Sequence, residues 1–229
     1  MDRDTHSALR TKLISFDVFG TLISVRDSSY SAFERILADA GAHHLDVKAF
    51  WEHWEHRNIA HYWDAYRSYR EICELSLVEV FAHFDIVGDS RLIDRYFEAF
   101  PRFFLYDDVV RTLERLSRRY KLAVVSNIDH DLLALTPLQR NFDLVCTAQR
   151  AKGYKPDGTL FRYLIENAGC AKDEILHAGQ SQFTDLVGGK PLGLTVAWIN
   201  RRHIVLNASV PRPDFILPDI QSLVRVVDF

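Results

Sequence analysis

The chain has 229 residues, of which 48% are hydrophobic and 26% charged, and its formal net charge is −3. This composition predicts a globular protein with a buried core and excludes intrinsic disorder. The slight negative charge argues against a nucleic-acid partner, because phosphate binding requires clustered excess positive charge.

The first predicted element is a short apolar strand over residues 13–17, which ends on Asp17. Gly20 and Thr21 then turn the chain. Ligand sites in open α/β sheets lie at the carboxyl ends of strands, so Asp17 is a candidate functional residue. Taken alone, an aspartate before a Gly-Thr turn is more often a capping residue, and the later motifs decide between the two interpretations.

Residues 23–104 contain no good strand but several helical patterns, including a long aromatic stretch over residues 47–84. An insertion of this length is too long to be a simple crossover loop. We therefore expect a helical cap over residues 23–104 and a core made of residues 1–22 and 105–229.

The remaining predicted strands follow the cap and alternate with helical patterns. They lie at residues 122–126, 143–147, 175–178 and 195–199. This alternation predicts an α/β fold with a doubly wound parallel sheet and helices on both faces. The proline-containing tail beyond residue 210 is expected to be irregular and to pack along the sheet edge.

The cysteines and the N-terminal residues indicate in which cellular compartment the protein is expected. Cys73, Cys146 and Cys170 are few, odd in number and widely separated, which predicts free thiols and neither a disulfide frame nor a zinc site. The first residues form no apolar signal core, and no apolar run reaches membrane-spanning length. We expect a cytoplasmic protein with a small carboxylated substrate and no nucleic-acid or membrane partner. The sequence leaves a homodimer open.

Polar motifs also follow the later strands. Ser126-Asn127 ends the second strand, Lys155 precedes a proline after the third, and Asp185 lies four residues after Ser181. Each has an ordinary explanation by itself, since Ser-Asn can cap a helix and a loop lysine can be merely solvated. A helix N-terminus binds anions in either case.

In order and spacing these motifs resemble the haloacid dehalogenase-like (HAD) superfamily, whose nucleophile is the first Asp of an Asp-x-Asp-x-Thr motif. The resemblance covers essentially the whole chain and implies a doubly wound core with an inserted cap. It implies that Asp17 is the nucleophile, steadied by Lys155 and Thr21. Asp185 would position the water. The residues implied to contact the substrate are Phe19, Ser126, Asn127, Trp63, Ser181 and Gln182.

Two departures from the motifs of HAD phosphatases affect the predicted chemistry. Phe19 stands where the second Asp of the first motif is expected, and Gln180 replaces the Asp of Gly-Asp-Ser. Phe19 cannot protonate a leaving group or activate water, and Mg²⁺ requires charged oxygen ligands. We therefore predict no cofactor and no metal, with Mg²⁺ only if the protein is a phosphatase after all.

The same two features are familiar in 2-haloacid dehalogenases, which carry an aromatic residue at the position of Phe19 and use no metal. The motifs also resemble those of azetidine-2-carboxylate hydrolase, which opens a strained C–N ring. The resemblance implies displacement of halide or ring nitrogen from an sp³ carbon next to a carboxylate, through an aspartyl ester. The alternatives are a Mg²⁺-dependent phosphatase of small esters and a catalytically silent binding protein.

The predicted cap both follows and departs from dehalogenase caps. The segment ending at Trp63 resembles their Tyr-x-Trp segment, and we expect Trp63 to face Asp17 as part of an apolar lid. Dehalogenases carry a cap Arg near the departing halide, where this chain has Glu55, and a Tyr where it has Phe161. The alternatives for the missing cap arginine are Arg57 and Arg67.

Overall fold

The computed structural model describes residues 10–227 and is built around a parallel sheet of six strands. In spatial order the strands are β5 (Leu144–Thr147), β4 (Lys121–Ser126), β1 (Leu13–Phe16), β6 (Ile175–Gly179), β7 (Thr195–Ile199) and β8 (Phe215–Leu217). All five pairings are parallel. The predicted α/β fold is thereby confirmed. The tail was expected to be irregular, and this is wrong for β8, which pairs with β7 along the sheet edge.

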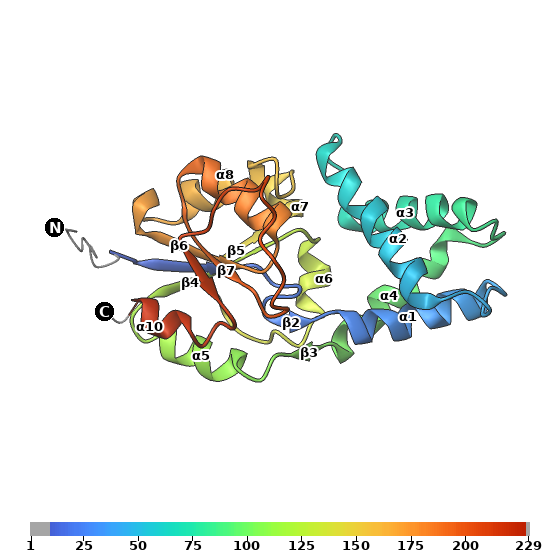
Figure 1. Ribbon diagram of the computed structural model, residues 1–229, viewed down its shortest axis with the longest axis horizontal. Helices are drawn as coiled ribbons and strands as arrows, with labels where there is room; N and C mark the ends of the chain where they lie inside the picture. The colour runs from blue at the N-terminus through green and yellow to red at the C-terminus, as the bar shows by residue number, and fades with distance from the viewer. Residues whose placement is uncertain (1–9, 228–229) are drawn as a thin grey trace.

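Helices cover both faces of the sheet, as Figure 1 shows, with α8 on one side and α5 and α10 on the other. They are α5 (Val109–Leu116), α6 (His130–Ala134), α7 (Ala148–Ala151), α8 (Thr159–Asn167), α9 (Val187–Gly189) and α10 (Leu223–Val227). Successive strand side chains alternate between the faces. In β4, for example, Leu122 packs with α5 and α10, whereas Ala123 packs with α8.

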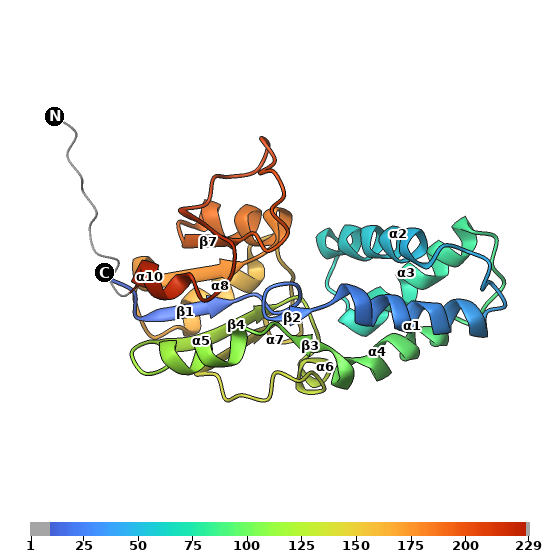
Figure 2. The same ribbon diagram turned by 60° about the horizontal axis from the view of Figure 1, so that its bottom comes forward.

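A helical layer lies beyond the carboxyl ends of the strands, as Figures 1 and 2 show. Its helices are α1 (Arg26–Asp39), α2 (Val47–Ala60), α3 (Tyr69–His83) and α4 (Asp94–Ala99). The chain enters and leaves it through β2 (Ile23–Ser24) and β3 (Phe104–Leu105), which pair antiparallel. These strands lie at the predicted boundaries of the cap, whose status as a separate domain stays a prediction.

Aromatic side chains form the interior of this cap, as a small helical bundle requires. The Phe33 ring lies 4.8 Å from that of Trp54, which lies 5.2 Å from that of Tyr96. These rings belong to the same buried cluster as α5 and one face of the sheet. Cap and sheet therefore share a continuous apolar core.

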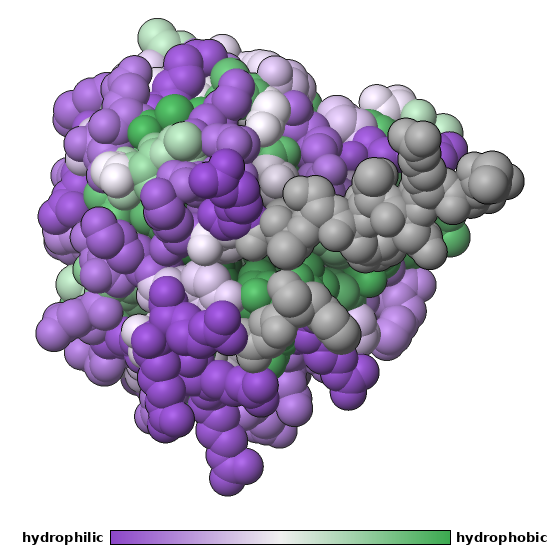
Figure 3. All heavy atoms as spheres, turned by 90° about the vertical axis from the view of Figure 1, so that its left-hand side faces the viewer, coloured by the Kyte–Doolittle hydropathy of each residue, from purple (hydrophilic) through white to green (hydrophobic). Residues whose placement is uncertain are grey.

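Short helical turns complete the fold. They are η1 (His61–Trp63), η2 (Ser90–Ile93), η3 (Phe100–Arg102), η4 (Lys172–Glu174), the π-helical η5 (Gln182–Leu186) and η6 (Lys190–Leu192). The end of the molecule away from the cap is largely hydrophilic (Figure 3). Within residues 10–227, no helix is long and apolar enough to cross a membrane.

Candidate active site

Asp17 follows β1 directly and lies on the wall of a cavity of about 570 Å³ between the sheet and the cap. Its backbone N–H donates to the carbonyl of Ala178 at 2.9 Å, which keeps it beside β6. The residue is only 8% exposed. The strand end thus delivers a single, largely buried carboxylate to the cavity wall.

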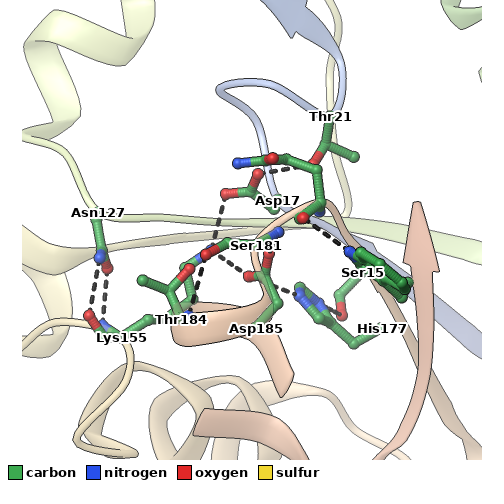
Figure 4. Close-up of polar contacts among 11 residues, drawn as sticks. Ser15, Asp17, Thr21, Asn127, Lys155, His177, Ser181, Thr184 and Asp185 are labelled. Carbon is green, nitrogen blue, oxygen red and sulfur yellow. Dashed lines mark hydrogen bonds and ion pairs between the residues drawn. The ribbon is translucent and has the colours of Figure 1, made fainter. Parts of the chain in front are cut away.

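A buried lysine links two carboxylates on this side of the sheet (Figure 4). Lys155 Nζ donates to Asp17 Oδ1 at 2.8 Å and to Asp185 Oδ1 at 2.7 Å. Lys155 is 1% exposed and Asp185 is fully buried. A buried cation shared by two carboxylates is a strong constraint, because removing the lysine would leave two buried carboxylates without their counterion.

Thr21 fixes the other oxygen of the nucleophile candidate. Its hydroxyl accepts from the Gln180 backbone N–H at 3.0 Å, so its own proton is directed to Asp17 Oδ2 at 2.7 Å. Gly20 makes the turn possible, since its φ is +86° and a Cβ there would lie 2.9 Å from Gln180 Cδ. Asp17 is therefore held at both oxygens.

Asn127 positions Lys155 and leaves its own amide little freedom. Its Nδ2 donates to the Lys155 carbonyl at 2.9 Å, and its Oδ1 accepts from the Lys155 N–H at 2.7 Å. The predicted contact between the Asn127 side chain and a substrate carboxylate does not fit these bonds. Ser126 does fit that role, because its buried Oγ lines the cavity and has no partner among the described residues.

Asp185 is held from behind by two residues that the sequence reasoning missed. His177 Nε2 lies 3.2 Å from Asp185 Oδ1, and His177 Nδ1 lies 2.9 Å from Ser15 Oγ. Ser15 and His177 are register partners in β1 and β6. The available signal was a polar residue at the inner position of each apolar strand, although spacing alone could not pair them.

Asp185 Oδ2 accepts from the Ser181 N–H at 2.9 Å, and Ser181 Oγ accepts from the Thr184 N–H at 3.1 Å. Both Asp185 oxygens are therefore occupied by donors of the chain. The predicted direct contact between Asp185 and the attacking water does not fit a fully buried, fully bonded carboxylate. Asp185 instead acts as the second counterion of Lys155.

The three charged groups shift one another's pKa values. Burial raises the pKa of Asp17, against the opposing charge of Lys155 and with the help of Asp185. Burial works against ionisation of Asp185 too, but Lys155 and His177 outweigh it and the pKa is lowered. Burial would lower the pKa of Lys155, yet the two carboxylates raise it. Lys155 is thus held as an ammonium, with Asp185 as the more firmly ionised partner.

Two other residues predicted to contact the substrate do not line the cavity. Trp63 is 62% exposed and lies outside the cavity lining, whereas Trp51 and Trp54 of α2 line the cavity. Gln182 also lies outside the lining. Its Nε2 donates to the Val205 carbonyl at 2.9 Å, and its Oε1 accepts from the Asn207 backbone N–H at 2.6 Å.

Phe19 lies at the cavity wall, with its ring 5.7 Å from that of Phe100. Phe161 is buried below the site, its ring 4.8 Å from the His177 ring. Neither suggested substitute for the cap arginine reaches the cavity, whereas two exposed arginines line it. The substitutes were Arg57 and Arg67, and the exposed lining arginines are Arg26 and Arg202. The partly buried Arg201, which is paired with Asp108, also lines the cavity.

The donor set does not fit Mg²⁺. Both oxygens of Asp17 and both of Asp185 already accept from an ammonium, a hydroxyl, an imidazole or an amide of the chain. Phe19 and Gln180 add no charged oxygen, which Mg²⁺ requires. Over residues 10–227, no group of three or more His, Cys, Asp or Glu side chains is arranged to hold a metal.

Residues 11–193 match the family model described as haloacid dehalogenase-like hydrolase, which confirms the resemblance inferred from the motifs. The (S)-2-haloacid dehalogenase 4A of Burkholderia cepacia is 26% identical over 197 residues, covering 82% of each chain. Haloacetate dehalogenase H-2 of Moraxella sp. (strain B) is 24% identical over 228 residues, covering 95% of this chain and 98% of the relative.

Among solved structures, L-2-haloacid dehalogenase from Xanthobacter autotrophicus superposes with a TM-score of 0.81 at 23% identity. The match covers 95% of this chain and 98% of the other. The similarity therefore includes both the sheet and the cap.

Proposed function

This chain belongs to the haloacid dehalogenase-like hydrolase family, and from that premise we propose that it displaces a leaving group from an sp³ carbon next to a carboxylate. The leaving group is a halide or a ring nitrogen. The observation that carries the proposal is Lys155 Nζ between Asp17 and Asp185, beside a cavity where Phe19 replaces a second carboxylate. The dehalogenase relatives, which act on this class of bond by name, support it.

In the first step an Asp17 oxygen forms a bond to the carbon while the leaving group departs with the bonding electrons. Thr21 and Lys155 hold the carboxylate in one orientation, which supports in-line attack. A halide leaves as an anion without a proton, so the absence of an acid at Phe19 is no obstacle. We infer that Ser126 donates to the substrate carboxylate; its Oγ has no partner among the described residues, and the residue lines the cavity.

In the second step water attacks the carbonyl carbon of the Asp17 ester and restores the carboxylate. The oxyanion that forms on Asp17 lies within reach of Lys155 Nζ, which is 2.8 Å from Oδ1. Esterification removes the charge of Asp17, and Asp185 then remains as the counterion that keeps Lys155 an ammonium. This division of roles explains why both carboxylates are present.

The origin of the product oxygen tests the proposal. A single turnover in ¹⁸O-water should give unlabelled product and place the label in Asp17, because water attacks the ester carbonyl. Mass spectrometry of the product and of the Asp17 peptide measures both. Asp17→Asn is the matched control and should show neither turnover nor label. Label in the first-turnover product with an unlabelled Asp17 would replace covalent catalysis by direct attack of water.

A further inference from the structure

One face of α2 forms the cap wall of the cavity. It presents Trp51, Trp54, Glu55 and Asn58, which recur at the spacing of successive helical turns, and Tyr62 of the adjoining η1 continues the wall. Several polar atoms on this wall already have partners in the chain. Trp54 Nε1 donates to the Cys73 carbonyl at 3.2 Å, and the Tyr62 hydroxyl donates to Asn58 Oδ1 at 2.8 Å.

Glu55 differs from Trp54, Asn58 and Tyr62; like Trp51 Nε1, its carboxylate has no partner among the described residues. Glu55 is partly buried and lines the cavity, yet its carboxylate makes no hydrogen bond or ion pair with any described residue. Burial raises the pKa of Glu55, while the charges of Arg26 and Arg202 work in the opposite direction. Both arginines are exposed, and neither is ion-paired to Glu55 within residues 10–227. The wall thus holds an acceptor without a donor.

The aromatic lining of the cavity adds attraction for a positive charge, whereas the charges of Arg26 and Arg202, which also line it, oppose one. The rings of Trp51, Tyr62, Tyr69 and Tyr96 line the same cavity, and aromatic faces attract cations electrostatically. A halide anion near Glu55 would instead be repelled. With about 570 Å³ of space, the cavity is also larger than a two-carbon or three-carbon halo acid requires.

We propose that Glu55 binds a protonated nitrogen of the substrate, so that the site prefers zwitterionic amino or imino acids over simple 2-halo acids. This inference rests on the proposed function and specifies its substrate class. Ser126 receives the substrate carboxylate at the sheet side, and Glu55 receives the cation at the cap side. Glu55 is a specificity residue, since it touches the substrate without exchanging a proton or bond with it.

For a cyclic imino acid the chemical step balances without an added acid. The ring nitrogen already carries two protons and a positive charge. As an Asp17 oxygen bonds to carbon, the C–N electron pair moves to nitrogen, which becomes a neutral amine, and Asp17 becomes a neutral ester. Water then hydrolyses the ester, Asp17 regains its charge, and the released proton is taken up by the amine.

Steady-state kinetics of the full chain with azetidine-2-carboxylate and 2-chloropropionate test the proposal. Glu55→Gln should raise KM for azetidine-2-carboxylate by about tenfold or more, the effect of losing one charge-assisted hydrogen bond. The KM for 2-chloropropionate should stay the same or fall. Glu52→Gln is the matched control, because Glu52 is exposed on the same helix outside the cavity. Equal effects of Glu55→Gln on both substrates would overturn the inference.

The affinities for butyrate and 2-aminobutyrate, measured by calorimetry, test the role of Glu55 in binding independently of turnover. Wild-type protein should bind 2-aminobutyrate more tightly, and Glu55→Gln should remove that preference. No difference between the two acids in the wild type would overturn the inference even if an Asp17 ester forms with 2-chloropropionate. Conversely, absence of any Asp17 ester, with the 2-aminobutyrate preference intact, would reject the proposed function and leave the cation site standing.

Discussion

At the scale of single residues, the site depends on how one ammonium is shared. Lys155 contacts Asp17 and Asp185 at nearly equal distances, yet the two carboxylates differ in pKa direction. Asp185 gains further donors from His177 and the Ser181 amide, and these favour its ionised form. Asp17 is left as the weaker acid of the two, which suits a carboxylate that must alternate between charge and ester.

This asymmetry predicts the pH dependence of activity. The nucleophile is ionised Asp17, and its pKa is raised above the ordinary 3.8. We expect kcat/KM to fall as the pH is lowered through the pKa of Asp17, because protonation removes the nucleophilic carboxylate. The midpoint of this fall should lie above pH 3.8. Since the charge of Asp185 contributes to the raised pKa, Asp185→Asn should move the midpoint for the residual activity to lower pH. A midpoint that stays in place in Asp185→Asn would contradict this account.

His177 is the next residue-scale prediction. Replacing it by Ala removes a donor from Asp185 and leaves Ser15 Oγ unpaired in the core. We expect the free energy of unfolding, measured with urea, to fall by about 2 kcal/mol or more. The kcat should also fall, because Asp185 then loses its support. Ser15→Ala, which spares the Asp185 contact, should cost less in both measurements; equal losses would show that the support of Asp185 has no separate role.

At the scale of elements, strand ends and one π-helical turn assemble the site. β1 ends in Asp17, and η5 places Asp185 on the inside while sending Gln182 to the segment that follows β7. That segment includes Arg202 and Ile204, which line the cavity. Gln182 therefore connects the segment that forms part of the cavity wall to η5 through hydrogen bonds, although Gln182 itself does not line the cavity.

Gln182→Ala should loosen this wall. Its side chain satisfies the Val205 carbonyl and the Asn207 amide, and both groups lose their partner in the variant. We expect faster amide hydrogen exchange at Asn207 and a KM raised severalfold, with a smaller change in kcat. Gln221→Ala, at an exposed position elsewhere, is the control. Unchanged exchange at Asn207 would show that other contacts hold the segment.

At the scale of the whole molecule, the cavity exists because the cap packs on the carboxyl ends of the strands. Residues from α1, α2, α3 and α4 line it together with the ends of β1 and β4. Cap and sheet share one buried apolar cluster, so the cavity wall is part of the folded core. Parallel strands make this arrangement possible, since all their carboxyl ends meet at one edge.

The metal-ligating side chains available beside Asp17 predict how activity responds to removal of metal ions by a chelator. The carboxylate oxygens of Asp17 and Asp185 are occupied by hydrogen-bond donors of the chain, and Phe19 and Gln180 supply no charge. We expect exhaustive EDTA treatment to leave turnover of carboxylated substrates unchanged within twofold. Activity on a phosphate ester that disappears with EDTA and returns with Mg²⁺ would establish the phosphatase alternative instead.

The sequence by itself determined the α/β fold and the strand that ends on Asp17, because strand periodicity and turn chemistry are local properties of the chain. Thr21, Lys155 and Asp185 were grouped with Asp17 by the resemblance that their motifs carry, and the structure joins them by hydrogen bonds. Local pattern is sufficient here because parallel strands bring their ends together whatever lies between them.

Only the tertiary structure decided which side chains meet away from those strand ends. Ser15 and His177 lie 162 residues apart and pair through the register of β1 and β6, which no spacing in the sequence encodes. The direction of Trp63, the partners of Gln182 and the position of Glu55 likewise depend on how helices pack over the sheet. Packing fixes these orientations by burial and by long-range hydrogen bonds, and both arise only once the chain has folded.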